Sequence, residues 1–439
     1  MRRPLLLALS LVLLLSACSA PSAAPDGGAD GGADGGPSGP PPSNWERSLL
    51  SADLSFDLAA HSATAALTFA PHDTPSASLR VGDLVLERVL AGGVEAVHER
   101  RGDELALRIA DEGEPVVVEI DYRFTEHTDL DGLLPTGVTL TWPTHCGNLF
   151  PCRPDPSEGA TYTLDVQGLP AGEVAIHPAR IDLPAPAYMV AFAVGDYTYR
   201  SLGTSAAGTE VGLHFLPGGE ATATRGTANL LAYVDTYEAL LGRYPFGDRL
   251  AAVEVSWTVP AAGGIEHHPF FHVSTQGMGS NEVHAHEAAH GWFGDGVRIA
   301  CWEDLVLSEG TTQYLAWRAI EAVDGPGTAD SLRAIMERRL ASAVNTADTE
   351  AYPDTCGVID LLDHPLWSRI PYEKGAFFFD EVDDRIGRPA LDAALARFVS
   401  ENLGRAAHMS DLIATIEAEA GQPIDDLVDR WLRSLGVPP

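Results

Sequence analysis

The sequence has almost no lysine, since Lys374 is the only one among 439 residues. Lysine and arginine together number 28 against 62 aspartates and glutamates, which gives a formal net charge of −34, and no segment is rich in basic residues. Proteins that bind nucleic acid neutralise its phosphates with cations. The charge therefore excludes DNA and RNA as partners, while it favours solubility and says little about the fold.

The amino terminus lacks a hydrophobic run long enough to span a bilayer, because the apolar stretch from Leu5 to Leu15 is too short. It follows Arg2 and Arg3 and precedes small residues, which is the pattern of an export signal. The junction Leu15-Ser16-Ala17-Cys18 resembles the bacterial lipobox. This resemblance implies a signal peptide over residues 1–18, with an acylated Cys18 as the first mature residue. The alternative is an ordinary cleaved signal with an incidental cysteine.

Residues 19–44 lack large apolar side chains and consist mainly of Ala, Pro, Gly, Ser and Asp. Such a composition predicts a flexible tether. Ser19 follows the cysteine, and by resemblance to lipoprotein sorting this residue favours an outer membrane. We expect an exported lipoprotein that faces the periplasm or the cell surface and meets the membrane through its lipid anchor only.

Cysteines are few, five in the whole chain, and the length suffices to bury a core without disulfides. Export would let the four remaining cysteines pair. Three pairings are possible, and sequence proximity favours Cys146 with Cys152, which leaves Cys301 with Cys356. Their spacing does not fit a zinc finger.

The composition, 45% hydrophobic and 21% charged, is that of a globular protein, and the length predicts two or three domains. Short alternating runs punctuated by Gly, Pro and Asp predict an antiparallel all-β domain over residues 45–205. Residues 206–439 have helical periodicity and predict a mostly α-helical domain. The strand-like segment 188–194 would be the hinge. The predicted helices are 229–241, 282–293, 311–323, 329–343, 373–386 and 391–401.

One motif carries candidate chemistry, the run His286-Glu287-Ala288-Ala289-His290. No Gly or Pro interrupts it, so it can be helical, and the two histidines four residues apart then share a face that can bind one Zn²⁺. Glu287, about 100° round the helix, can reach a water at the open metal position. His284 lies on another face, and we expect it at the surface.

A third ligand decides whether this motif is a zinc site. Glu309 follows His290 with eighteen residues between them, where a second helix could return its carboxylate to the metal. Two histidines and a glutamate with an open fourth position are a catalytic zinc set, whereas structural sites use cysteines. The sequence therefore predicts one Zn²⁺ per chain, held by His286, His290 and Glu309.

Other segments accompany this motif in a recognisable order. Together with the run HEAAHGWFGDGV and Ser308-Glu309-Gly310, they resemble the aminopeptidase N family of zinc metallopeptidases, with its FPCxDxP, GAMEN and catalytic-tyrosine segments. The resemblance extends from about Trp45 to the end, and implies a saddle-like β-domain followed by a thermolysin-like catalytic domain. The segments are Phe150-Pro151-Cys152-Arg153-Pro154-Asp155-Pro156, Gly263-Gly264-Ile265-Glu266-His267, Trp302-Glu303-Asp304-Leu305 and Tyr372-Glu373-Lys374-Gly375-Ala376.

The chemistry of the motif and the family resemblance assign roles to individual residues. Glu287 would take the proton of the zinc-bound water and pass it to the leaving amine. Tyr372, by resemblance, would donate a hydrogen bond to the tetrahedral oxyanion. Glu266 would pair with the free α-ammonium of a peptide, while Gly263 and Gly264 let its backbone approach closely.

The sequence also departs from the family pattern. The segment 140–145 lacks the Gln or Glu that usually supplies a second anchor for the substrate amine. His267 and Ser308 each replace an Asn, and Asp295 stands where the family usually has Asn, either to orient a ligand or in a surface turn. The chain ends at Pro439, shortly after Trp431-Leu432, so we expect the family's large helical carboxy-terminal domain to be absent and the site to be more open.

Three functions fit these observations. The first is a lipid-anchored zinc aminopeptidase that hydrolyses amino-terminal residues from peptides. The second is a zinc endopeptidase or amidase, which the missing second anchor favours. The third is a peptide-binding lipoprotein without catalysis, which the presence of Glu287 and Tyr372 disfavours. Peptides are the expected partners, and no motif in the sequence identifies a protein partner.

Overall fold

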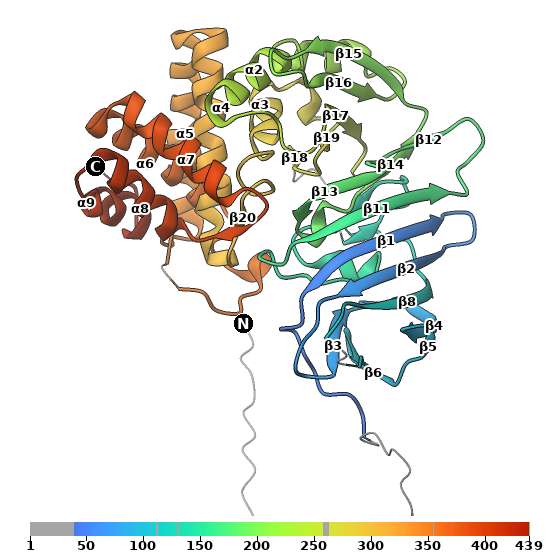
Figure 1. Ribbon diagram of the computed structural model, residues 1–439. Coiled ribbons are helices and arrows are strands. Elements are labelled where there is room, and N and C mark those ends of the chain that lie inside the picture. Colours follow the sequence, from blue (N-terminus) through green and yellow to red (C-terminus); the bar gives the residue numbers. More distant parts are fainter. Residues whose placement is uncertain (1–38, 111–112, 130, 258–262, 354, 439) are drawn as a thin grey trace, which may run out of the picture. The chain divides into compact units, whose positions relative to one another are not determined.

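A computed structural model of the chain describes residues 39–110, 113–129, 131–257, 263–353 and 355–438. Contacts between residues divide the chain into Met1–Gly39 and Pro40–Pro439, and every element named below belongs to the second unit (Figure 1). The predicted signal peptide, Cys18 and the tether up to residue 38 lie outside the described residues. No helix within the described ranges has both the length and the apolar character of a membrane span.

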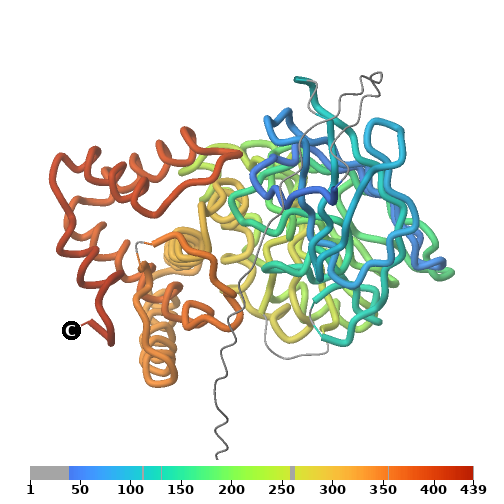
Figure 2. The backbone as a smooth tube through the Cα atoms, turned by 90° about the horizontal axis from the view of Figure 1, so that it is seen from below, coloured from blue at the N-terminus to red at the C-terminus, as the bar shows by residue number. Residues whose placement is uncertain are grey.

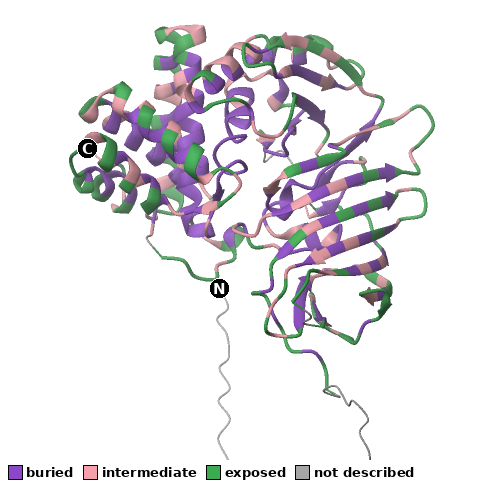
Figure 3. Cartoon of the chain, viewed as in Figure 1, coloured by how far each residue is buried: buried purple, intermediate pink, exposed green. Residues whose placement is uncertain are grey.

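The first half of the unit is built on a seven-stranded sheet. Along β1 (Leu49–Asp57), buried Leu54 and Phe56 alternate with exposed residues, the period of a strand with one buried face (Figure 3). Neighbouring strands are antiparallel except for β1 and β11, which are parallel. The strand order is β13 (Arg180–Ala185), β11 (Ala160–Gln167), β1, β2 (Ser62–Phe69), β8 (Val116–Arg123), β4 (Val85–Ala91) and β5 (Val94–Glu95).

Smaller sheets complete this half of the unit. A disulfide joins Cys146 to Cys152, the pairing that sequence proximity favoured, and the Arg80 and Cys152 backbones exchange hydrogen bonds of 2.8 and 3.0 Å. One sheet has the order β3 (Ser76–Arg80), β7 (Glu104–Arg108) and β6 (His98–Arg101), and two strand pairs are β9 (Gly132–Leu133) with β10 (Thr139–Leu140) and β12 (Val174–Ile176) with β14 (Ala193–Gly195).

The segment 188–194, predicted as a strand, is mostly not one. Ala187–Met189 is a turn of 3₁₀ helix, and only Ala193 and Val194 belong to strand β14. Every residue from 187 to 195 is buried, so the segment has no alternation between an inner and an outer face. A short continuous apolar run cannot be assigned by periodicity, because burial on all sides removes the pattern that distinguishes strand from helix.

The second half begins with a sheet that the prediction of a mostly helical domain overlooked. Its strands β16 and β17, and β17 and β19, are parallel, while the two outer pairs are antiparallel. β17 has no exposed residue after Arg249, which again hides strand alternation. The order is β15 (Thr198–Thr204), β16 (Glu210–Phe215), β17 (Arg249–Val255), β19 (Phe270–Ser274) and β18 (Gly264–Ile265).

Helices follow this sheet, and each of the six predicted helices overlaps one of α2 to α7. Gly325 and Gly387, at φ 86° and 85°, end α4 and α6, and each next helix has proline in its first turn. The helices coloured orange to red gather together in Figure 2. Their bounds are α1 Glu220–Gly226, α2 Leu230–Leu241, α3 Asn281–Ala289, α4 Leu305–Asp324, α5 Pro326–Thr346, α6 Arg369–Ile386, α7 Arg388–Asn402, α8 Met409–Ala420 and α9 Asp425–Leu427.

Candidate metal centre and active site

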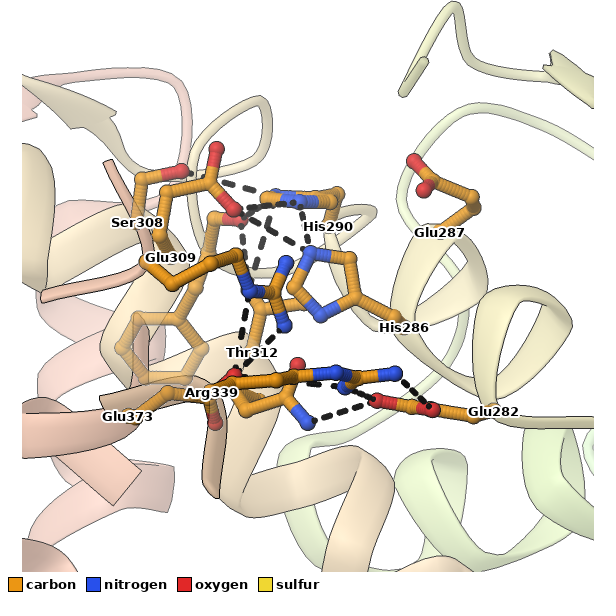
Figure 4. A network of polar contacts seen from close by, with 12 residues as sticks. Glu282, His286, Glu287, His290, Ser308, Glu309, Thr312, Arg339 and Glu373 are labelled. Atoms are coloured by element: carbon orange, nitrogen blue, oxygen red, sulfur yellow. Dashed lines mark hydrogen bonds and ion pairs between the residues drawn. The ribbon is translucent and has the colours of Figure 1, made fainter. Parts of the chain in front are cut away.

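Two helices bring the predicted metal ligands together. Helix α3 begins at a Ser280 side chain that caps the Val283 amide, and His290 follows its last turn. The Nε2 atoms of His286 and His290 lie 3.1 Å apart. Oε2 of Glu309, on α4, lies 3.1 Å from the first nitrogen and 3.4 Å from the second (Figure 4). All three side chains are buried.

These three atoms fit a tetrahedral metal site. Zn–N bonds of about 2.0–2.1 Å hold neighbouring ligand atoms about 3.3 Å apart, close to the observed separations. Nδ1 of His290 lies 3.0 Å from the Phe293 carbonyl. A proton on that nitrogen donates to the carbonyl and leaves the Nε2 lone pair for the metal, which is how metal-binding histidines are usually oriented.

The electrostatics of the cluster favour an ionised Glu309. Burial alone would raise the pKa of its carboxyl, but the charge of His290 and the hydrogen bonds from both histidines hold that pKa well below its ordinary value. Burial lowers the pKa of His286. Burial would lower the pKa of His290, but the carboxylates around it raise that pKa well above the ordinary value. Zinc is ligated by a carboxylate and by neutral imidazoles, so its binding would displace a proton from His290.

Glu287 stands apart from the hydrogen-bonded cluster (Figure 4). Burial raises the pKa of its carboxyl well above the ordinary value, which suits a group that accepts a proton. Gly264 on β18 packs directly against it, because a Cβ at that position would lie 2.6 Å from the Glu287 Cγ and Oε1 atoms. Only glycine therefore leaves room for this side chain.

A residue that sequence reasoning missed holds the backbone of Glu287. Nε2 of His268 lies 2.8 Å from the Glu287 carbonyl, and its Nδ1 lies 2.7 Å from the Tyr244 hydroxyl. Both side chains are buried. The sequence shows only an adjacent pair of histidines, which has no spacing that would indicate this contact.

Glu266 shares a cavity of about 680 Å³ with the metal ligands and Glu287. Its carboxyl is buried, and burial raises its pKa, while the charge of His290 and an indole hydrogen bond from Trp142 act in the opposite direction. Gly263 and Gly264 line the same cavity. The structure thus brings the predicted amine anchor, general base and metal ligands to one site.

Tyr372 reaches the site because α4 and α6 cross in close contact. A Cβ on Gly375 would lie 2.5 Å from the Cα of Gly310, so only glycines permit this crossing. The Tyr372 ring stacks on the His286 ring, with centroids 5.7 Å apart and planes 16° apart. Burial raises the pKa of Tyr372 well above its ordinary value, which keeps the phenol protonated as a hydrogen-bond donor.

Two residues beside the motif differ from the expectations. His284 was expected at the surface, which is wrong, because it is fully buried and its Nε2 lies 3.0 Å from the Met278 carbonyl. Asp295 is also buried, so it is not in a surface turn, and it accepts a hydrogen bond of 3.1 Å from Tyr188. The Nδ1 atom of His290 meets Phe293 instead of Asp295.

The structure also shows where the two residues lie that replace an Asn of the family pattern. Ser308 Oγ lies 3.4 Å from Nδ1 of His290, at the edge of the metal centre. The His267 ring is buried and its centroid lies 4.8 Å from that of His272. A disulfide joins the other favoured pair, Cys301 before α4 and Cys356 on the connection between α5 and α6.

Comparisons with known proteins agree with this arrangement. Residues 271–431 match the model of the Peptidase family M1 domain. This part of the chain is similar to a family M1 peptidase domain. The chain is 28% identical over 331 residues to leucine aminopeptidase 2 of Sclerotinia sclerotiorum, a match that covers 67% of this chain and 53% of the relative. The chain thus spans about half the length of the curated relatives it matches.

Solved structures share the fold. The M1 zinc metallopeptidase of Deinococcus radiodurans superposes with a TM-score of 0.73 and 19% identity, covering 90% of this chain and 95% of that one. Yeast LTA4 hydrolase in complex with bestatin gives 0.74 and 21%, covering 90% and 69%. The predicted fold class, an all-β half before a mostly helical peptidase half, is confirmed. The cofactor is one Zn²⁺, for which His286, His290 and Glu309 form the site.

Proposed function

We propose that this chain is a zinc aminopeptidase that removes amino-terminal residues from peptides. The observation that carries the proposal is the buried carboxylate of Glu266 in the cavity that also holds the zinc ligands and Glu287. A buried carboxylate that lines this cavity suits the ammonium group of a substrate. A peptide with a free amino terminus supplies that charge, whereas a blocked peptide does not.

The residues around the metal divide the reaction between them. Zinc bound at this site supplies a Lewis acid and a water whose pKa is lowered toward 7. Glu287 accepts the proton of the attacking water and returns it to the leaving amine. Tyr372 donates its phenolic hydrogen to the oxyanion of the tetrahedral intermediate. Glu266 fixes the amino terminus, so that the first peptide bond lies at the metal.

A second candidate function is a zinc endopeptidase or amidase. Its support is the wall of the cavity that Leu140 and Trp142 form, in the segment where the resemblance places a second polar anchor. An apolar wall there holds a substrate without requiring a free amino group. The two functions differ in what they do with an acetylated peptide.

The test uses the purified protein with aminoacyl anilides and with a peptide in free and N-acetylated forms. We expect the free-amine substrates to be hydrolysed, the acetylated peptide to resist, and Glu266→Gln to raise KM more than it lowers kcat. Zinc content measured beside activity controls for loss of metal. Cleavage of the acetylated peptide at the rate of the free one contradicts the aminopeptidase and favours the endopeptidase.

We further propose that the chain is an exported lipoprotein anchored through Cys18, at an outer membrane. The support is the lipobox resemblance of Leu15-Ser16-Ala17-Cys18 and the low-complexity composition of residues 19–44. Mass spectrometry of the mature amino terminus in a bacterial host should find a diacylglyceryl group on Cys18. Recovery of Cys18→Ala and wild-type protein in the same soluble fraction would contradict the anchor.

A further inference from the structure

The cavity at the metal adjoins a second cavity of about 550 Å³. Both are lined by Arg339, Leu362, Trp367, Ser368 and Arg369, which therefore form the boundary between them. The second cavity is bounded by α5, the start of α6 and the connection before it. The metal ligands and Glu266 line only the first cavity, whereas the arginines lie at its boundary with the second.

The two arginines line both cavities, and each is paired with a carboxylate, of which that of Glu282 also lines the first cavity. Arg369 donates from Nε and Nη2 to Oε1 of Glu373, at 3.0 and 2.8 Å, and Arg339 donates to both oxygens of Glu282 (Figure 4). The arginine side chains are 39% and 34% exposed, whereas Glu373 is 0% and Glu282 19% exposed. Each carboxylate thus orients a cation that is more exposed than the carboxylate itself.

One donor remains for a ligand. Within the described residues, Nη1 of Arg369 has no hydrogen-bond partner, although this side chain lines both cavities. A guanidinium with free donors that is already oriented by a buried partner binds a carboxylate at small entropic cost. We propose that Arg369, with Arg339 beside it, binds the carboxy-terminal carboxylate of a short peptide.

Distances along the stacked rings set the length of that peptide. The Arg369 guanidinium carbon lies 4.3 Å from the Tyr372 ring centroid, which lies 5.7 Å from the His286 ring centroid. The guanidinium is therefore at most about 10 Å from the imidazole of a metal ligand. A hydrogen bond takes up about 3 Å of this span. The remainder accommodates at most about two residues at about 3.3–3.6 Å each, beyond the bond at the metal.

A tripeptide satisfies both ends of the site at once. Its ammonium pairs with Glu266, its first peptide bond lies at the metal, and its carboxylate meets Arg369. Without the arginines, the carboxylates of Glu266, Glu287 and Glu309 would repel a substrate carboxylate at this short range. The proposal rests on the proposed aminopeptidase function and adds a preferred substrate class, free tripeptides, to it.

The experiment compares trialanine with its carboxy-terminal amide, which differs only in the charge at that end. We expect kcat/KM to be at least tenfold higher for the free acid, and to be higher for trialanine than for dialanine or pentaalanine. In Arg369→Gln the ratio of acid to amide falls to about one, and in Arg369→Lys it lies between. A disturbance of Tyr372 would slow the hydrolysis of both substrates alike, so it would leave the ratio of acid to amide unchanged.

Arg385→Gln is the matched control, since Arg385 is on the same helix and pairs with the exposed Asp426. Calorimetric titration of Glu287→Gln with both peptides adds a reading that does not depend on turnover, and the amide should bind at least tenfold more weakly. Equal kcat/KM for acid and amide in the wild type, or an unchanged ratio in Arg369→Gln, overturns the proposal.

The same measurements separate this proposal from the proposed function. Hydrolysis of alanyl anilide by a protein that does not distinguish acid from amide overturns only the carboxylate site. Failure to hydrolyse every free-amine substrate overturns the aminopeptidase together with the proposal. If the purified Arg369→Gln protein does not fold, the wild-type ratio and the titration of Glu287→Gln decide the outcome.

Discussion

At the scale of single residues, the site separates the group that moves a proton from the groups that bind metal. Glu287 is buried beside the ligands but takes no part in their hydrogen bonds (Figure 4). We predict that Glu287→Gln lowers kcat by about 10²–10⁴-fold, because an amide cannot accept the proton. Zinc content by atomic absorption should stay at one per chain. A variant that loses zinc in parallel with activity would instead assign Glu287 to metal binding.

Gly264 supports a second prediction at the same scale. A Cβ there would lie 2.6 Å from Oε1 of Glu287, so Gly264→Ala must displace the carboxylate. We expect kcat/KM to fall by about 10–100-fold, since a small displacement of a catalytic group costs about this much. Gly327→Ala is the control, because no atom lies within 4 Å of the added Cβ. Equal activity of both variants would contradict this role of Gly264.

At the scale of elements, the crossing of α4 and α6 places two parts of the site. Gly310 directly follows Glu309, and Gly375 lies three residues after Tyr372. We predict that Gly375→Ala lowers the free energy of unfolding by about 1–3 kcal/mol, the usual cost of overpacking a core. It should also lower kcat, because separation of the helices moves Tyr372 from His286. Urea denaturation should show the lower free energy of unfolding, and an activity assay the lower kcat. If neither quantity changes, the crossing adapts to the added methyl group.

Local periodicity explains which elements could be predicted from the sequence. The spacing of His286 and His290 needs only one helical turn, and Ser280 caps that helix from within the same segment. His284, in contrast, is buried by residues that lie outside α3, and a helical wheel of α3 does not show them. Strand β17 escaped prediction because its continuous burial removes alternation. Arg369 joins the site only through the tertiary contact of α6 with the metal centre.

At the scale of the whole folded unit, residues from both halves enclose the substrate cavity. Trp142, from the β-sheet half, packs against Trp367 before α6 at a centroid distance of 4.6 Å and against Trp302 at 5.9 Å. Leu140 and Trp142 line the same cavity as the metal ligands. The site therefore depends on the fold of the complete unit, and its metal should in turn stabilise that fold.

Removal of zinc tests this coupling. A ligand that binds only the folded state stabilises it by about 4 kcal/mol at a thousand times its Kd. For a unit of this size, a chelator should therefore lower Tm by about 5 °C in a thermal denaturation scan. His286→Gln removes one of the three ligands, and its Tm should not respond to the chelator. A shift of equal size in both proteins would mean that the chelator acts elsewhere. Zinc bound by His286, His290 and Glu309 would then not be the source of the stabilisation.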